Sequence, residues 1–469
     1  MLFNSLHFLI FFPIVLIFTN LLKDRKQKIF LLLASFYFYM ALNTFIVFLL
    51  LFSILVDYFA ALKISELVSH DKKRKLYLVL SLVTNLGFLG YFKYTNFLLG
   101  VFNDVNVFSS LRFPVYNIIL PVGISFYTFQ SMSYTIDVYR GLIPVEKSFL
   151  NFALYISFFP QLVAGPIVRA GTFFRDLKNR LPVDVEVIRY SFAQILLGFT
   201  KKIVFADNLA LTVDFVHRNH AALNAMEIWT GVFAFMWQIY FDFSGYTDIA
   251  IGVARLFGFQ FDLNFYFPFN VASISQHWAR WHISFTSWIR DYIYIPLGGS
   301  RGSRFQVHRN IFITFMFGGI WHGAAYHFLA WGIWHSIMLS VEREYAATKL
   351  RAFLNEKGGR VYDLFSRIFT MFCLGVGLPL FRADTMNDAH LMLKKMLLID
   401  PNSISQSFIN FNYFKLVVLF FITGYIFEKH NLKSVMGKPR AFTFFILANA
   451  IMIIAFSVSD AKNFIYFAF

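Results

Sequence analysis

The sequence predicts an all-α polytopic membrane protein, and three observations support this fold class. Of its 469 residues, 58% are hydrophobic and only 14% are charged, whereas ordinary soluble domains are about 45–50% apolar and about 25% charged. Phenylalanine alone accounts for 64 residues. The apolar residues also occur in continuous runs, which is the pattern of membrane helices rather than of a transmembrane β-barrel. Soluble globular, disordered and fibrous proteins are therefore excluded.

The apolar runs are spread along the whole chain. A membrane span needs about 20 largely apolar residues, and windows interrupted by Pro or polar residues are candidates for re-entrant segments, so we expect roughly 9 to 12 true spans. In chain order, the windows are Leu2–Leu22, Ile29–Leu42, Phe45–Ala61, Leu76–Leu99, Val115–Ile136, Leu150–Gly165, Val187–Phe205, Met226–Phe243, Ile311–Leu339, Phe365–Leu380, Phe414–Phe427 and Phe442–Val458.

The basic residues lie in short loops between these runs, and the formal net charge is +16. Two basic loops, residues 23–28 and 71–75, are separated by two windows, so the positive-inside rule places both in the cytoplasm and the N-terminus outside. The basic segments Arg140–Lys147 and Arg169–Arg180 have one apolar stretch between them, which indicates a re-entrant or half-crossing segment nearby. The charge is an orientation signal, and no nucleic-acid partner is expected.

Three further features bear on the class of protein. The first apolar segment has no basic n-region and no small-residue cleavage site, so it is expected to be a retained span. Cys373 is the only cysteine and lies in an apolar run, which predicts a buried thiol and no internal disulfide. No internal repeat or soluble-domain sequence is visible, so residues 1–469 are expected to form one membrane-embedded domain.

The region from Asn264 to Arg309 is aromatic, polar and charged, although it lies between strongly apolar runs. Residues 276–291 predict a helix with one aromatic face that contains a single histidine, and Arg280 points to the opposite side. Such a helix could lie at the membrane interface as an aromatic belt, or it could line a polar cavity with the histidine facing a ligand. The aromatic face comprises Trp278, Trp281, His282, Phe285, Trp288 and Ile289.

A loop at residues 292–301 ends this helix with a proline and two adjacent glycines, which permit tight turns. Arg301, Arg304 and Arg309 follow closely. The loop could therefore hold the phosphates of a nucleotide thioester, although a cytoplasmic basic loop accounts for the arginines equally well.

His322 is the strongest single candidate for a functional residue. It follows the start of its apolar run at Ile311 by about 16 Å of helix, and ionisable groups at membrane depth are costly and usually face a cavity. The neighbouring glycines would either leave space around the imidazole or bring two helices into close contact. Histidine suits general-base chemistry because its ordinary pKa is near neutrality. His327 and His335, later in the run, are interpreted as packing or interfacial residues.

Acidic residues supply weaker candidates. Asp242 and Asp248 lie within or beside an apolar stretch, where Asp242 could orient a histidine or both could bind a cation. His277 and His282 are separated by about 140° around a helix, so they do not have the spacing of a zinc site. No metal is expected, and no Walker loop, nucleophile elbow or dinucleotide-binding motif is present.

Several ordered blocks of sequence resemble the membrane-bound O-acyltransferases. They resemble in particular the branch that O-acetylates bacterial polysaccharides, which includes the alginate and peptidoglycan O-acetyltransferase membrane subunits. The resemblance extends over nearly the whole chain. The blocks are Leu120–Gln130, Phe159–Ile167, Phe243–Asp248, Trp281–Gly299, Gly319–Gly323 and Phe464–Phe467.

The resemblance implies a ring of helices around a funnel or tunnel, with a catalytic core at about residues 115–340. The deeply buried histidine of the family corresponds to His322, and its second, more cytoplasmic polar position corresponds to His282. An acyl thioester, such as acetyl-CoA, would enter from the cytoplasm as a substrate, with no bound cofactor. The acyl group would cross the bacterial inner membrane toward a separate periplasmic polysaccharide O-acetyltransferase subunit.

The roles expected from this resemblance are specific. His322 would act as a general base or as a transient acyl acceptor, and His282 would position the donor or assist proton movement. The remaining candidates would line the passage or contact the donor phosphates. Those lining it are Asp242, Trp281, Trp288 and Trp321, and those contacting phosphates are Arg280, Arg290 and Arg301.

Two alternatives remain open from the sequence. One is D-alanyl transfer to teichoic acid, which uses a related channel and a carrier protein as donor. The other is a proton-coupled transporter, in which His322 and Asp242 would relay protons. A transporter would move its substrate without consuming an acyl donor.

Overall fold

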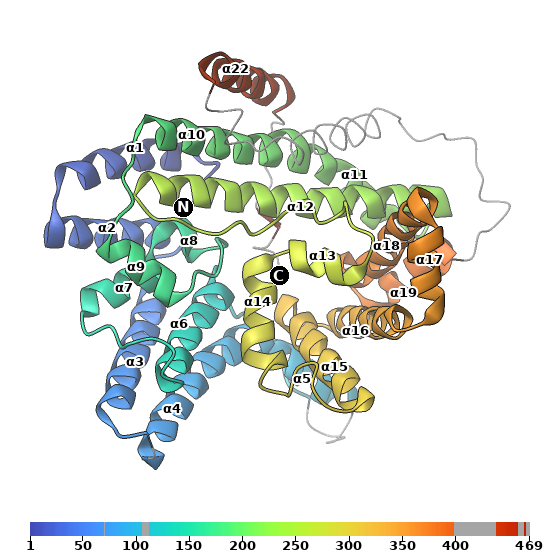
Figure 1. The fold of residues 1–469 in the computed structure, drawn as a ribbon, viewed down its shortest axis with the longest axis horizontal. Coiled ribbons are helices and arrows are strands. Elements are labelled where there is room, and N and C mark those ends of the chain that lie inside the picture. Colours follow the sequence, from blue (N-terminus) through green and yellow to red (C-terminus); the bar gives the residue numbers. More distant parts are fainter. Residues whose placement is uncertain (70, 106–111, 398–437, 458–463, 466–469) are drawn as a thin grey trace. The chain divides into compact units, whose positions relative to one another are not determined.

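The computed structural model describes residues 1–469 except residues 70, 106–111, 398–437, 458–463 and 466–469, and its described residues form helices and connecting segments without a strand (Figure 1). The predicted all-α class is confirmed. The chain divides into two compact units, each built from two stretches of sequence. Unit 1 comprises residues 1–195 and 246–262, and unit 2 comprises residues 196–245 and 263–469.

Unit 1 contains the N-terminal helices. Side chains cap some of their first turns: Ser5 accepts a hydrogen bond from the backbone N–H of Phe8, and Asp71 accepts one from Lys73. The helices are α1 (Leu6–Leu21), α2 (Asp24–Met40), α3 (Ile46–Glu66), α4 (Lys72–Leu89), the π-helical segment η1 (Gly90–Tyr94), α5 (Thr95–Val105), α6 (Ile124–Tyr139), α7 (Phe149–Ser157), α8 (Phe159–Leu162), α9 (Ala170–Lys178) and most of α10 (Val185–Thr200).

A buried polar network joins three helices of unit 1, α3, α4 and α6, which lie side by side (Figure 1). The carboxylate of Asp57 is fully buried and accepts hydrogen bonds from the hydroxyls of Ser81 and Ser131. The side-chain amide of Asn85 donates to both carboxylate oxygens, at 3.0 and 2.8 Å. A buried carboxylate is tolerated when it is hydrogen-bonded in this way, so the network fixes the register of the three helices.

Two of the apolar windows expected in unit 1 are not continuous helices. The window Val115–Ile136 is helical only from Ile124, and Gly123 before it has a left-handed φ of +82°. A Cβ at Gly123 would lie 2.8 Å from the carbonyl oxygen of Leu162, so glycine is required both by the backbone and by the close approach. The window Leu150–Gly165 is broken between α7 and α8, because Pro160 cannot continue the first helix.

Unit 2 carries the rest of the described chain. The long helix α12 (Ala225–Leu256) begins in unit 2, and its residues from 246 onward belong to unit 1. The other elements are the π-helical segment η2 (Lys201–Ala206), α11 (Asp207–Asn219), α13 (Ile274–Arg280), α14 (Ile283–Ile289), the π-helical segment η3 (Arg290–Tyr294), α15 (Arg304–His322), α16 (Tyr326–Ala346), α17 (Lys349–Lys357), α18 (Gly359–Arg382), α19 (Met386–Leu397) and α22 (Pro439–Phe456).

Four helical segments of the described residues are long and apolar enough to cross a membrane, namely α3, the continuous stretch Lys72–Val105, α18 and α22. Helix α1 is apolar but shorter. The window Phe414–Phe427 lies outside the described residues. The full number of spans, roughly 9 to 12 by length, stays a prediction.

The apolar window Ile311–Leu339 forms two helices rather than one. Helix α15 ends at His322, and α16 starts at Tyr326 and lies alongside it (Figure 1). Glycines allow this contact: a Cβ at Gly319 would lie 2.4 Å from the carbonyl oxygen of Phe328, and one at Gly332 would lie 2.5 Å from that of Phe315. His322 therefore lies at the end of a helix rather than within one.

Candidate active site

His322 is the last residue of α15, and its side chain is buried, with 3% of its surface exposed. Aromatic rings surround the imidazole: the ring centroids of Trp331 and Phe381 lie 5.0 and 4.8 Å away, both nearly perpendicular to it. Of the two expectations for the glycines beside His322, close packing holds at Gly323. A Cβ at Gly323 would lie 1.9 Å from the ring of Phe328, so this side is filled.

The space beside His322 is a cavity of about 40 Å³ in unit 2. That volume is room for roughly three water-sized groups. Its walls come from α12, α13, α15, α16 and α18, together with Phe269 before α13 and Trp281 directly after it. The α18 residues lie beyond the catalytic core expected at about residues 115–340. The lining residues are Met236, Ile239, Phe269, His277, Trp278, Trp281, His322, Trp331, His335, Leu374, Leu378 and Phe381.

The predicted single helix over residues 276–291 is wrong, because it is broken at Trp281 and His282 into α13 and α14. His282 has a left-handed backbone with φ +41°, a conformation that costs a non-glycine residue about 1–3 kcal/mol and persists only where its surroundings hold it. All residues of the expected aromatic face are nevertheless buried. The break therefore changes the directions in which these side chains point, although they all remain buried.

Asn264 holds the turn at His282. Its backbone oxygen accepts from the N–H of Ile283 at 2.9 Å. Its side-chain oxygen accepts from the backbone N–H and hydroxyl of Ser284 at 3.1 and 2.9 Å, and from Nδ1 of His282 at 3.3 Å. Asn264 is itself buried, so one side chain fixes both the strained backbone and the ring of His282.

His282 and His322 belong to one aromatic cluster. The rings of Phe285 and Trp321 stack on each other at 4.1 Å. Phe285 lies 5.2 Å from the ring of His282 and 6.0 Å from that of His322, and Trp321 lies 5.8 and 4.8 Å from the same two rings. The two histidines predicted to act together are therefore connected through two aromatic side chains.

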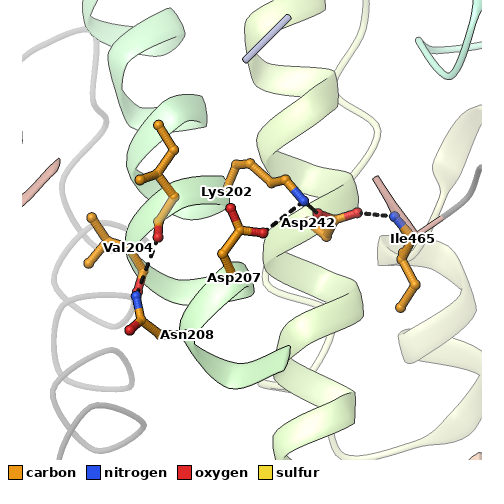
Figure 2. Close-up of polar contacts among 7 residues, drawn as sticks. Lys202, Val204, Asp207, Asn208, Asp242 and Ile465 are labelled. Atoms are coloured by element: carbon orange, nitrogen blue, oxygen red, sulfur yellow. Dashed lines mark hydrogen bonds and ion pairs between the residues drawn. The ribbon is translucent and has the colours of Figure 1, made fainter. Parts of the chain in front are cut away.

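Asp242 forms a buried ion pair (Figure 2). Nζ of Lys202 lies 2.6 Å from Oδ1 of Asp242 and 2.9 Å from Oδ1 of Asp207, and all three side chains are buried. The backbone N–H of Ile465 donates to Oδ2 of Asp242 at 2.6 Å. Asp242 is not among the residues that line the cavity, whereas the next residue, Phe243, packs against the ring of His282 at 4.7 Å.

The remaining predicted residues lie outside the cavity wall. Trp288 is buried and packs against Tyr292 at 5.0 Å. Arg290 forms an exposed ion pair with Asp291 at 2.8 Å, and Arg280 lies over the ring of Tyr266. Arg301 is exposed in the glycine-rich loop. Of the predicted set, the structure brings His322 and Trp281 to the cavity and places His282 and Trp321 in the adjoining aromatic cluster.

Several residues of this site carry no functional signal in the sequence. Asn264 carries no motif, and the α18 residues on the cavity wall are ordinary apolar residues of a span. His335, for which the sequence favours a packing or interfacial role, lines the same cavity as His322. His335 lies 13 residues after His322 in the sequence, and only the return of the chain in α16 brings the two together.

The chemistry of the site is that of imidazole in a cavity lined by apolar and aromatic side chains. No group of three or more potential metal ligands occurs in the part of the chain that the structure describes. A buried imidazole can take a proton from a hydroxyl and return it to a leaving group. A membrane-embedded site of this kind suits transfer of a small acyl group.

The sequence model of MBOAT, the membrane-bound O-acyltransferase family, matches residues 31–381 of the chain. The chain belongs to this family and is a multi-pass membrane O-acyltransferase. It is 38% identical over 405 residues to the probable alginate O-acetylase AlgI of Pseudomonas aeruginosa, a match covering 84% of this chain and 75% of that protein.

Two other relatives represent different acceptors. The peptidoglycan O-acetyltransferase of Helicobacter pylori is 36% identical over 398 residues, which cover 79% of this chain and 73% of that protein. The teichoic acid D-alanyltransferase of Bacillus subtilis is 26% identical over 238 residues, which cover 48% of this chain and 60% of that protein. The two acetyl-transferring relatives therefore match more of the chain than the D-alanyl-transferring one.

Proposed function

We propose that the protein moves acetyl groups from a cytoplasmic thioester, acetyl-CoA, across the bacterial inner membrane for O-acetylation of an envelope or extracellular polysaccharide. The observation that carries this proposal is the position of His322 on a small cavity, whose other lining residues, among those that the structure describes, are apolar, aromatic or histidine. The names of the alginate and peptidoglycan relatives support acetyl as the group and a polysaccharide as the final acceptor.

The reaction needs one base and no metal. A hydroxyl oxygen attacks the carbonyl carbon of the thioester, and His322 takes the hydroxyl proton. The carbon–sulfur bond breaks, and the thiolate takes the proton from His322. The products are an acetyl ester and a free thiol, and an apolar, water-excluding site protects the thioester from hydrolysis.

The size and polarity of the cavity favour acetyl over D-alanyl. An acetyl group, two carbons and an oxygen, matches a cavity of about 40 Å³, which is room for roughly three water-sized groups. A D-alanyl group adds a methyl group and an ammonium ion. Among the lining residues that the structure describes there is no carboxylate to pair with that ion, and burying it unpaired would be costly.

The remaining parts of the proposal concern the donor and the partner. Arg280, Arg290 and Arg301 are the proposed contacts for the donor phosphates, since arginine binds phosphate with two parallel hydrogen bonds. His282 positions the donor beside the aromatic cluster. A periplasmic transferase subunit receives the acetyl group and passes it to peptidoglycan or to an alginate-like polymer.

Labelled acetyl-CoA tests this function directly. Membranes that contain the protein are expected to release free CoA and to transfer label to envelope polysaccharide, and His322→Ala is expected to abolish both while the protein still inserts into the membrane. His327 offers a matched control, because it is buried but does not line the cavity. His327→Ala is expected to retain transfer.

Three results would contradict the proposal. Retained acetylation in His322→Ala would exclude this histidine as the base. Label transfer from D-alanyl carrier protein but not from acetyl-CoA would favour the D-alanyl alternative. Substrate flux without consumption of any acyl donor would indicate a transporter.

A further inference from the structure

Two further imidazole rings, those of His277 and His335, line the cavity beside His322. The other lining residues that the structure describes are Met, Ile, Leu, Phe and Trp, so the polar side-chain atoms on its walls are ring nitrogens. Whether each nitrogen donates or accepts a hydrogen bond therefore decides what chemistry the cavity offers.

A hydrogen bond from Trp278 determines which nitrogen of His335 carries a proton. Nε1 of Trp278 lies 3.3 Å from Nδ1 of His335, and an indole nitrogen can only donate. Nδ1 of His335 therefore accepts, which requires a neutral imidazole with its proton on Nε2. His335 is thus a hydrogen-bond donor at Nε2.

His277 has the opposite polarity. Its Nδ1 lies 2.8 Å from the carbonyl oxygen of Pro268, and a carbonyl can only accept, so Nδ1 carries the proton. The ring lies between Phe269 and Trp281, at 5.8 and 5.5 Å, where a second proton would bury a charge among aromatic rings at high cost. Nε2 of His277 is therefore an acceptor, and of these two rings His335 is the one that can donate.

The Nε2 edge of His335 faces α18. A Cβ built at Gly377 would lie 3.6 Å from this nitrogen, and neighbouring positions of α18 form a wall of the cavity. The rings of His335 and His322 both pack on Trp331, with centroids 4.6 and 5.0 Å from it. The donor is therefore held in place on two sides, close to the proposed base.

We infer that His335 is a second catalytic residue, which donates its Nε2–H to the carbonyl oxygen of the acyl thioester. This inference rests on the proposed function. As the hydroxyl oxygen bonds to the carbonyl carbon, the π electrons of the carbonyl move to its oxygen, and the hydroxyl proton goes to His322. The Nε2–H of His335 stabilises the negative oxygen. The carbonyl then re-forms as the carbon–sulfur bond breaks, and the thiolate takes the proton from His322.

Two conservative substitutions of His335 test the inference. In His335→Gln the side-chain amide reaches the position of Nε2, whereas in His335→Asn it reaches only that of Nδ1. Release of CoA from acetyl-CoA is measured in native envelopes that contain the full chain and its acceptor. Loss of an oxyanion donor lowers kcat by about 10²–10³-fold, so we expect this loss in His335→Asn, with the KM for acetyl-CoA little changed, and partial recovery in His335→Gln.

The outcomes separate the inference from the proposed function. Equal rates in the Asn and Gln variants, or a rate in His335→Asn close to that of the unaltered protein, would overturn the role of His335. No release of CoA by the unaltered protein would overturn the proposed function, and the inference with it. His327→Asn is the matched control for loss of a buried imidazole, because His327 donates from Nδ1 to the carbonyl oxygen of Leu380 and Asn can keep that bond.

Discussion

The ammonium group of Lys202 is a buried charge whose neighbours bear on the stability of unit 2. It lies between the carboxylates of Asp207 and Asp242, and only 1% of its side-chain surface is exposed. The ring of Phe464 lies 4.7 Å from Nζ, and the next residue, Ile465, donates its backbone N–H to Asp242. Three segments distant in the sequence, those of Lys202 and Asp207, of Asp242 and of Ile465, therefore meet at one ion pair (Figure 2).

Lys202→Met is predicted to destabilise the protein strongly. Removing one partner of a buried ion pair costs about 3–5 kcal/mol, because the other charge is left buried and uncompensated. Thermal or denaturant unfolding of the detergent-solubilised protein measures the loss. The double variant Lys202→Met/Asp242→Asn has less uncompensated charge, so part of the lost unfolding free energy should be recovered. An unfolding free energy of Lys202→Met within about 1 kcal/mol of the unaltered protein would contradict this role.

The same ion pair bears on the site through the helix that carries it. Asp242 is followed by Phe243, whose ring lies 4.7 Å from that of His282. The apolar stretch around Asp242 predicts a buried acid, but the sequence does not indicate Lys202 as its partner. Lys202 belongs to a π-helical segment. The spacing of residues in an apolar window does not show which basic side chain pairs with a buried acid.

At the level of helices, the contact between α15 and α16 determines where His322 lies. The carbonyl oxygens of Phe328 and Phe315 approach the backbone of the facing helix so closely that a Cβ at Gly319 or Gly332 would overlap them. Small residues at such contacts allow membrane helices to pack through van der Waals contact. Among the described residues Gly318 has no such neighbour, since a Cβ there would meet none of their atoms within 4 Å.

The pair of adjacent glycines makes a matched comparison. Gly319→Ala is predicted to destabilise the protein by about 1–3 kcal/mol, the usual cost of overpacking, and to lower activity because it displaces the end of α15 at His322. Gly318→Ala is predicted to be neutral or stabilising, because alanine is the better helix former. Unfolding midpoints and CoA release of the two variants provide the measurement. Equal midpoints would show that the two helices can separate without cost.

How much of these elements could be predicted depends on the physical signal each one leaves in the sequence. Continuous apolar runs predict helices, and 3.6-residue periodicity predicts which residues are buried, as the aromatic face around Trp281 shows. The break at His282 has no such signal, because its left-handed backbone is held by Asn264, eighteen residues earlier in the chain. The α18 wall of the cavity could not be predicted either, since it depends on tertiary packing.

At the scale of the whole molecule, orientation in the membrane follows from the basic loops. The basic segments at residues 23–28 and 71–75 lie mostly in the first turns of α2 and α4. Helix α3, between them, is long and apolar enough to span. Helix α2 has 17 residues, or about 26 Å at 1.5 Å per residue, against about 30 Å of hydrocarbon, and residues 24–28 at its start are charged or polar. That α2 also crosses is a prediction of the positive-inside rule.

Cysteine accessibility tests this orientation, and the chain is suited to the test because its one native cysteine, Cys373, is buried. We predict that a membrane-impermeant thiol reagent added to whole cells labels Thr44→Cys, in the exposed turn between α2 and α3, but not Lys26→Cys or Lys73→Cys. Those two should react only in inverted vesicles, and the unaltered protein should react in neither. If Lys26→Cys and Lys73→Cys react from opposite sides, α2 does not cross, and the predicted orientation is contradicted. If both variants react from the same side, α2 must cross the membrane as well as α3. The positive-inside rule then makes that side the cytoplasm, where an acyl-CoA donor is found.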